Sequence, residues 1–90
     1  MQRFIIEREI PGAGELTEEQ LGEVARTSNE AVSSLGVPYR WVVSYVTADK
    51  VYCVYIADSE DLVRRHATEG GFPATRVSEV RAVIDPATAE

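Results

Sequence analysis

The segment Tyr39–Asp58, YRWVVSYVTADKVYCVYIAD, constrains the fold more than any other part of this chain. Two runs rich in Val, Tyr, Trp and Ile flank the polar tetrad Thr47–Lys50, a pattern that predicts a β-hairpin. Because side chains alternate across a strand, each run presents apolar or aromatic groups on both of its faces. Strands that are apolar on both faces have to be buried on both faces. We expect helices of the same chain to cover one face, and a partner subunit, a closed pocket or a bound ligand to cover the other.

The turn of this hairpin decides which side chains share a face with Cys53 and Tyr55. A turn of two residues places Ser44 on that face, whereas a turn of three residues places Trp41, Val43 and Tyr45 there. The segment holds the only Trp and the only Cys of the chain. The sequence leaves both registers open.

Composition limits the classes of protein to which the chain can belong. Its 90 residues are enough for a single domain, 1–90, with a modest core. The formal net charge of −6 disfavours nucleic acid and anionic membrane surfaces as partners, because both bind basic proteins. No run approaches transmembrane length, and one cysteine cannot form an internal disulfide. We therefore expect a cytoplasmic protein in which Cys53 remains a thiol.

The rest of the chain is expected to form two strands and two helices around the hairpin. Thr17 and Gln20 match a capping box, which predicts that a helix begins at Glu18. Gly70 and Gly71 predict the end of a second helix, which Asp58 or Ser59 caps at its start. The expected elements outside the hairpin are a strand at 2–10, a helix at 18–35, a helix that ends at Gly70-Gly71 and a strand at 76–84.

The order of these elements, β-α-β-β-α-β, predicts the ferredoxin-like α+β fold. In this fold a four-stranded antiparallel sheet has its first and third strands at the centre and both helices on one face. The fold name does not imply an iron–sulfur cluster, since one cysteine cannot ligate one. The second face of the sheet carries enough apolar area to favour a homodimer, in which sheets pack back to back in an α/β-barrel-like assembly.

The only histidine, His66, is a candidate for a binding site. Its spacing in the second helix turns it toward the sheet that holds Cys53 and Tyr55, and imidazole and thiolate suit borderline metals such as nickel or zinc. The other interpretation is a core histidine that is hydrogen-bonded to a Tyr hydroxyl or a carboxylate. Cys53 is likewise either a ligand or a small buried apolar side chain.

Glu7 lies in a central strand, where its carboxylate faces either solvent or a pocket. A cross-strand ion pair with Arg3 or Arg81 is the structural interpretation. In the functional alternative, an enzyme acts on a small molecule between helices and sheet, with His66 and Glu7 as acid and base. The hairpin aromatics either stack a ligand or form core and interface.

A resemblance to a known family rests on the segments IIERE, SYVTADKVYCVY, RRHATEGGFPATRVSEV and RAVIDP. They are similar to those of a family of small bacterial proteins described as nickel-binding-like. The resemblance implies a ferredoxin-like domain that pairs into dimers and holds a divalent metal ion, with nickel as the cofactor. We therefore predict a small protein that binds nickel or a similar divalent transition metal, with His66, Cys53 and Glu7 at the metal and with Tyr55 and Ser44 in the lining of the site.

Overall fold

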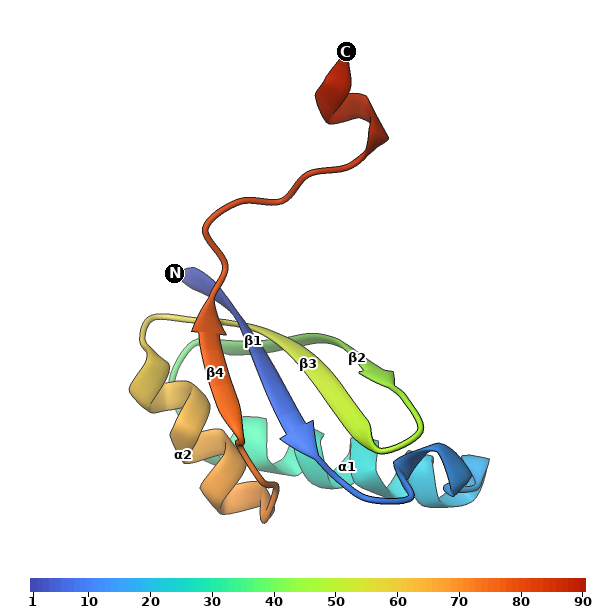
Figure 1. Ribbon diagram of the computed structural model, residues 1–90. Coiled ribbons are helices and arrows are strands. Elements are labelled where there is room, and N and C mark those ends of the chain that lie inside the picture. Colours follow the sequence, from blue (N-terminus) through green and yellow to red (C-terminus); the bar gives the residue numbers. More distant parts are fainter.

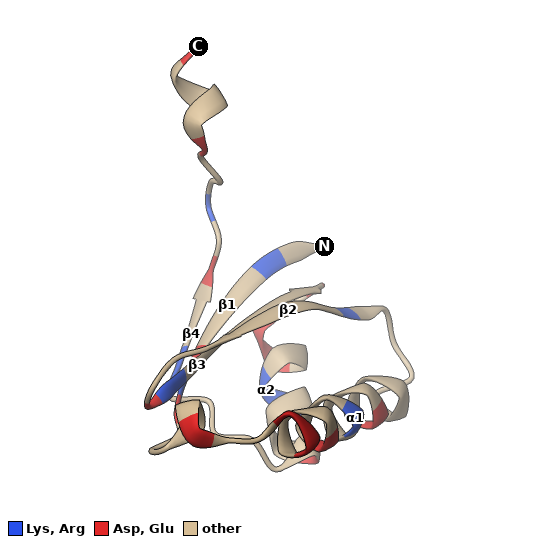
Figure 2. Cartoon of the chain, turned by 90° about the vertical axis from the view of Figure 1, so that its right-hand side faces the viewer, with Lys and Arg blue, Asp and Glu red and all other residues tan.

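The computed structural model describes residues 1–90 as a four-stranded sheet with two helices on one of its faces (Figures 1 and 2). In chain order the elements are β1 (Gln2–Glu9), the 3₁₀ helix η1 (Ala13–Glu15), α1 (Glu18–Ser34), β2 (Tyr39–Val46), β3 (Lys50–Ala57), α2 (Glu60–Gly70), β4 (Arg76–Glu79) and the 3₁₀ helix η2 (Pro86–Ala89). The strand order is β2-β3-β1-β4 and all neighbours are antiparallel. The predicted α+β ferredoxin-like fold is therefore confirmed, with the first and third strands at the centre.

Both helices begin and end at the signals that the sequence contains. The Thr17 hydroxyl accepts a hydrogen bond from the Gln20 amide at 3.2 Å, and the Gln20 side chain accepts one from the Thr17 amide at 2.9 Å. This capping box pairs two amides that would otherwise lack partners at the start of α1. Ser59 caps α2, and Gly71 ends it with a φ of 71°, which favours glycine.

The hairpin turn contains two residues and packs against η1. The Thr47 amide donates to the Lys50 carbonyl at 2.8 Å, so Ala48 and Asp49 form the turn. The Gly14 amide of η1 donates to the Ala48 carbonyl at 3.0 Å. The turn is therefore held by the segment between β1 and α1, and of the two open registers the two-residue turn is the one observed.

A β-bulge in β2 changes which side chains face the helices. Trp41 pairs with Tyr55, and Val43 pairs with the adjacent Val54. Val42 therefore has no partner and is the extra residue. In a regular strand, side chains three residues apart point to opposite faces. The bulge restores Trp41 to the face of Ser44, and the inner face of the hairpin carries both.

The last strand is shorter than predicted, because its partner strand ends. β4 ends at Glu79, which pairs with Phe4, whereas the sequence pattern predicted a strand over 76–84. The Val80 amide still donates to the Arg3 carbonyl at 2.8 Å. Beyond this point β1 offers almost no backbone to pair with, and the chain extends away from the sheet to η2 (Figure 1).

The core lies between the helices and the inner face of the sheet. Its eight buried side chains are Phe4, Ile6, Leu35, Tyr39, Cys53, Tyr55, Ala57 and Val63. Neither α1 nor α2 combines the length and the apolar surface that a membrane-spanning helix needs. Figure 2 shows both helices below the sheet, with acidic residues along α1.

Candidate functional site

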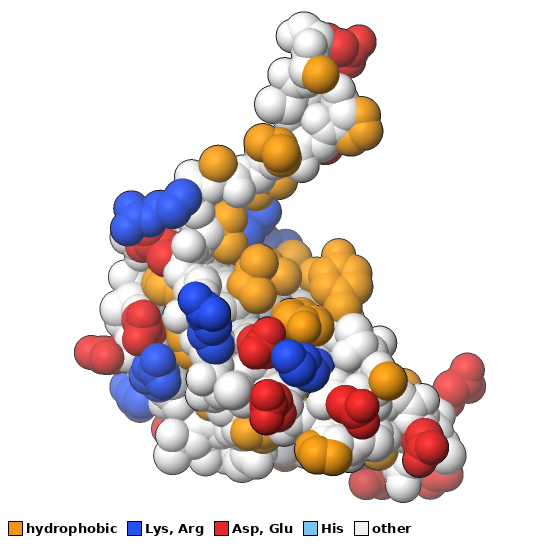
Figure 3. Space-filling view, viewed as in Figure 1, with side chains coloured by type: hydrophobic (Ala, Val, Ile, Leu, Met, Phe, Trp, Pro, Cys, Tyr) orange, Lys and Arg blue, Asp and Glu red, His pale blue; other side chains and the backbone are white.

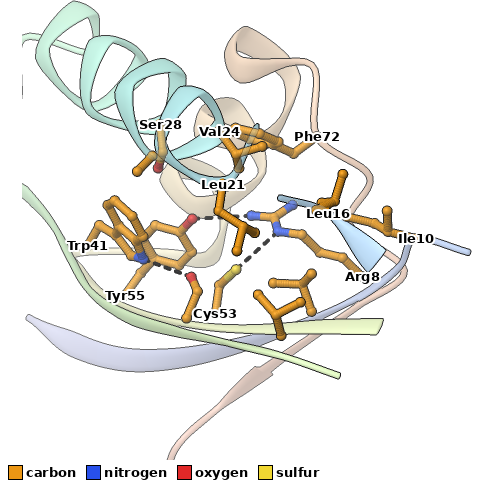
Figure 4. A pocket seen from close by; sticks show the side chains of 14 residues that line it. Arg8, Ile10, Leu16, Leu21, Val24, Ser28, Trp41, Cys53, Tyr55 and Phe72 are labelled. Atoms are coloured by element: carbon orange, nitrogen blue, oxygen red, sulfur yellow. Dashed lines mark hydrogen bonds between the residues drawn. The ribbon is translucent and has the colours of Figure 1, made fainter. Parts of the chain in front are cut away.

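A cavity of about 290 Å³ lies between α1 and the inner face of the sheet (Figure 4). Its hydrophobic lining residues are Ile10, Leu16, Leu21, Val24, Ala25, Trp41, Val46, Val51, Cys53, Tyr55 and Phe72. The polar lining residues are Arg8, Ser28 and Ser44. Val24 and Val46 are 44% and 42% exposed, so the cavity reaches solvent between α1 and the edge strand β2.

A buried arginine crosses one end of this cavity. Arg8 is only 2% exposed. Its Nε donates to Cys53 Sγ at 3.4 Å, its Nη2 donates to the Tyr55 hydroxyl at 3.4 Å, and its Nη1 donates to the Pro73 carbonyl. The guanidinium carbon also lies 5.4 Å from the centre of the Phe72 ring, within the range of a cation–π contact. None of the ion pairs in the chain includes Arg8.

The hairpin contributes a second fixed group to the cavity wall. Trp41 Nε1 donates to Ser44 Oγ at 2.9 Å, a contact that depends on the bulge between them. This hydrogen bond satisfies the indole N–H and fixes the orientation of the ring. The wall formed by β2 is therefore an aromatic plane held in one orientation.

His66 lies next to this cavity and does not line it. Its side chain is fully buried, and its Nε2 lies 3.2 Å from both the hydroxyl and the carbonyl oxygen of Ser28. Because a carbonyl only accepts, Nε2 carries the proton and donates. The ring packs among Tyr39, Tyr55 and Phe72, with centroids 4.8–6.0 Å away, and its Nδ1 has no hydrogen-bond partner.

Burial sets the protonation of these groups. Burial lowers the pKa of His66, and the Arg8 charge lowers it further, although the Ser28 carbonyl and Glu69 oppose the shift. The ring is therefore neutral at physiological pH. Burial, followed by the influence of Cys53, raises the pKa of Tyr55 to about 12 despite the nearby Arg8. Tyr55 thus remains a neutral phenol that accepts the hydrogen bond from Arg8.

The predicted site residues are divided between the two faces of the sheet. Cys53, Tyr55 and Ser44 line the same cavity. Glu7 does not join them, because β1 alternates and it is Ile6 that pairs with Cys53 on the inner face. The expectation that Glu7 lies beside Cys53 is therefore corrected.

The combinations of residues that we expected for catalysis or metal binding do not form within one chain. Glu7 lies on the outer face, where its carboxylate is 3.7 Å from Lys50 Nζ, and it cannot act with the buried His66 as an acid–base pair. Lys50, and not Arg3 or Arg81, is its ionic partner. The chain contains no cluster of three or more His, Cys, Asp or Glu side chains that could hold a metal ion.

Sequence reasoning missed Arg8, although the chain contains a signal for it. Phe4, Ile6 and Arg8 share one face of β1 by simple alternation, and all three are buried. A charged residue that continues the core face of a central strand is therefore a site candidate. The roles of Ser28 and Phe72 depend on how α1 and the segment after α2 pack, which alternation does not predict.

Comparison with known proteins identifies the family of this chain. Residues 4–80 match the family of nickel responsive proteins described as SCO4226-like. The chain belongs to this family. The crystal structure of SCO4226 from Streptomyces coelicolor A3(2) aligns with a TM-score of 0.76 and 16% sequence identity, over 91% of this chain and 99% of that chain. No curated protein matches significantly.

These findings confirm the resemblance that the sequence segments indicated. At 16% identity the structural match to the SCO4226-like protein shows the fold alone. Nickel response is part of the family description and gives no residue of this chain a role. The cavity and its polar groups therefore carry the functional argument.

Proposed function

We propose that this protein binds a small organic molecule in the cavity between α1 and the sheet. The observation that carries the proposal is an apolar cavity of about 290 Å³ into which a few fixed polar groups converge. Small-molecule sites have this character, and their volumes begin at about 300 Å³. A ligand of this size would lie against Trp41 and enter between Val24 and Val46.

The lining supports binding more than acid–base catalysis. The titratable side chains of the lining are Arg8, Cys53 and Tyr55, so the lining contains no carboxylate and no histidine. Tyr55 stays protonated because its pKa is raised to about 12, and arginine does not give up its proton in proteins. The cavity can therefore orient a ligand but offers neither a carboxylate nor a histidine as a general base.

A cavity-filling substitution tests this proposal. Ala25→Phe projects a ring into the cavity, whereas Thr27→Phe places the same ring on the exposed side of α1. We expect calorimetry to detect binding of hexanol, hexanamide or hexanoate to the wild type and to Thr27→Phe, and none to Ala25→Phe. The proposal fails if no probe binds the wild type and native mass spectrometry finds no small molecule on the purified protein.

Nickel binding by this chain is a second proposal, which the family description supports. The buried groups do not fit a nickel site: the chain has no cluster of three or more potential ligands, the His66 ring packs among aromatic rings, and Cys53 accepts from the cationic Arg8. Nickel ligands would therefore lie outside the core or be shared by two chains.

Elemental analysis after dialysis against nickel tests this second proposal. We expect uptake by the wild type, and equal uptake by His66→Phe and Cys53→Ala. Absence of nickel from the wild type would refute nickel binding. A loss of nickel in either variant alone would instead show that the buried residues ligate it.

We also propose that two copies of the chain form a homodimer through the outer face of the sheet. Ile5, Val43 and Tyr45 are 40%, 37% and 62% exposed on this face. Figure 3 shows hydrophobic side chains gathered beneath the C-terminal tail, with charges of both signs nearby. Such a surface can be complementary to itself around a two-fold axis. Val83 and Ile84 of the tail are also largely exposed, and they supply further apolar area for the partner.

Light scattering after size-exclusion chromatography tests the dimer. Ile5→Lys puts a charge in the centre of the proposed interface, and Val37→Lys puts one at an equally exposed position, 40% in both cases, in the loop before β2. We expect dimers for the wild type and Val37→Lys, and monomers for Ile5→Lys. A monomeric wild type at micromolar concentration contradicts the proposal.

We place the protein in the cytoplasm as a further proposal. Cys53 is a buried free thiol, and thiols stay reduced in that compartment. Immunodetection in fractionated cells tests this location, and recovery of the protein outside the cytoplasmic fraction would contradict it.

A further inference from the structure

Arg8 indicates the chemical class of ligand that the cavity takes. We infer that the ligand is a small amphipathic carboxylate, whose carboxylate contacts the Arg8 guanidinium and whose apolar part fills the space between α1 and the sheet. This inference rests on the proposed function and adds the identity of the charged group.

Arg8 has no counter-charge within the chain. Arg8 is 2% exposed, and none of the six ion pairs of the chain includes it. Its acceptors are a sulfur, a phenol oxygen and a carbonyl oxygen. Buried charges in proteins are normally paired with an opposite charge or bound to a ligand. The chain carries a net charge of −6, yet no carboxylate of its own reaches this arginine.

Arg8 also keeps N–H donors that no group of the chain uses. A guanidinium has five N–H donors, and Arg8 makes three hydrogen bonds, one from each nitrogen, so two donors are left, one on each terminal nitrogen. Donors on both terminal nitrogens can contact the two oxygens of one carboxylate, as in a bidentate arginine–carboxylate pair. A phosphate group, with three terminal oxygens and up to two charges, would be left with an oxygen unpaired among apolar walls.

The cavity leads from an exposed mouth inward to Arg8. Figure 4 shows Arg8 reaching between Leu21 and Cys53 toward Tyr55. Arg8 is almost fully buried, whereas Val24 at the mouth is 44% exposed. A ligand therefore enters with its carboxylate inward, and its apolar part lies in the hydrophobic section of the cavity.

A purely structural role for Arg8 makes a different prediction. Its three hydrogen bonds join β1, β3 and the segment after α2, so its loss would lower stability whatever the ligand. A structural role gives no preference for a charged ligand over a neutral ligand of the same shape. Comparison of hexanoate with hexanamide separates the two roles.

Trp41 provides a signal for this comparison, since it is the only tryptophan and lines the cavity. The full chain is titrated at pH 7.5 with hexanoate and hexanamide, followed by Trp41 fluorescence and calorimetry. Charge-assisted hydrogen bonds make hexanoate bind at least about tenfold more tightly. Arg8→Met removes this preference by weakening hexanoate. Arg3→Met, on the exposed outer face of the same strand, preserves it.

The outcomes separate this inference from the proposed function. Equal affinities of hexanoate and hexanamide for the wild type overturn the carboxylate assignment and leave the cavity as a binding site. No binding of hexanoate or hexanamide overturns the carboxylate assignment, and the proposed function fails with it if hexanol also does not bind and native mass spectrometry finds no small molecule on the purified protein. If Arg8→Met does not fold, Arg8→Lys keeps the charge without the two-pronged donor, and hexanoate is expected to bind about tenfold more weakly. Wild-type affinity in Arg8→Lys would refute the bidentate contact.

Discussion

Acidification should destabilise this protein through a single buried side chain, His66. The ring is fully buried, and burial lowers its pKa from the ordinary 6.5. In the unfolded chain the same ring is in water and takes up a proton near pH 6.5. Below that pH the unfolded state therefore binds more protons than the folded state, and the free energy of unfolding falls.

The size of this fall in the free energy of unfolding is limited because His66 takes up a single proton. The contribution of His66 to stability is complete above pH 6.5 and is lost as the pH falls from the unfolded pKa toward the lower folded pKa. In this range one proton lowers the free energy of unfolding by up to about 1.4 kcal/mol per pH unit. Between pH 7.5 and 5.5 the loss due to His66 is therefore at most about 1.4 kcal/mol, and it is largest if the folded ring stays neutral throughout this range.

His66→Phe isolates this contribution. Phenylalanine suits the surrounding rings of Tyr39, Tyr55 and Phe72, and the lost hydrogen bond to Ser28 costs about 1 kcal/mol. Urea denaturation at pH 7.5 and 5.5, followed by Trp41 fluorescence, measures both proteins. Carboxylates titrate in both and cancel in the difference. Equal losses of stability on acidification in wild type and variant would refute the reasoning.

Three further predictions concern the scaffold, and denaturant unfolding at pH 7.5 tests each. Thr17→Ala removes the capping box of α1 and should cost about 1 kcal/mol; an unchanged midpoint would contradict the role of the cap. Gly14→Ala places a Cβ 2.9 Å from Ala48 Cα and should destabilise the contact between η1 and the hairpin turn. Gly22→Ala meets only a side chain at 3.5 Å and should stabilise α1 by about 1 kcal/mol. Changes of the same sign in the free energy of unfolding for both variants would be inconsistent with the clash at Gly14. Ile6→Ala removes a fully buried side chain and should cost about 3 kcal/mol; a loss below about 1 kcal/mol would show that the core relaxes around it.

Local signals in the sequence were sufficient to predict the elements and their order. The capping box at Thr17 and the glycines at the end of α2 are contacts within a few residues, so the chain specifies them without tertiary information. The topology follows from element order, because few arrangements connect β-α-β-β-α-β without crossings. The end of β4 depended instead on the extent of β1, which no local pattern reveals.

The candidate site was only partly predictable, because it depends on contacts between elements. Simple alternation along β1 already placed Glu7 and Ile6 on opposite faces of the sheet. The assignment of Glu7 to the same site as Cys53 was therefore avoidable. The Arg8 contacts join residues 45 to 65 positions apart and needed the packed structure. His66 was correctly expected to face the sheet, but its hydrogen-bond partner is Ser28 of α1 and not a tyrosine or a carboxylate.

The bulge at Val42 also determines how this chain tolerates changes of length. A chain that lacked Val42 would present Tyr39, Trp41 and Ser44 on the same face of β2 by unbroken alternation. A deletion at this one position would therefore preserve the composition of the cavity wall. Deletion of the neighbouring Val43 would also remove the bulge. Val42 would then occupy the position of Val43, and Trp41 and Ser44 would stay on the same face. Deletion of Ser44 would instead remove the group that holds the indole. The bulged pair Val42–Val43 is thus the part of the wall where gaps are expected when chains of this fold are aligned.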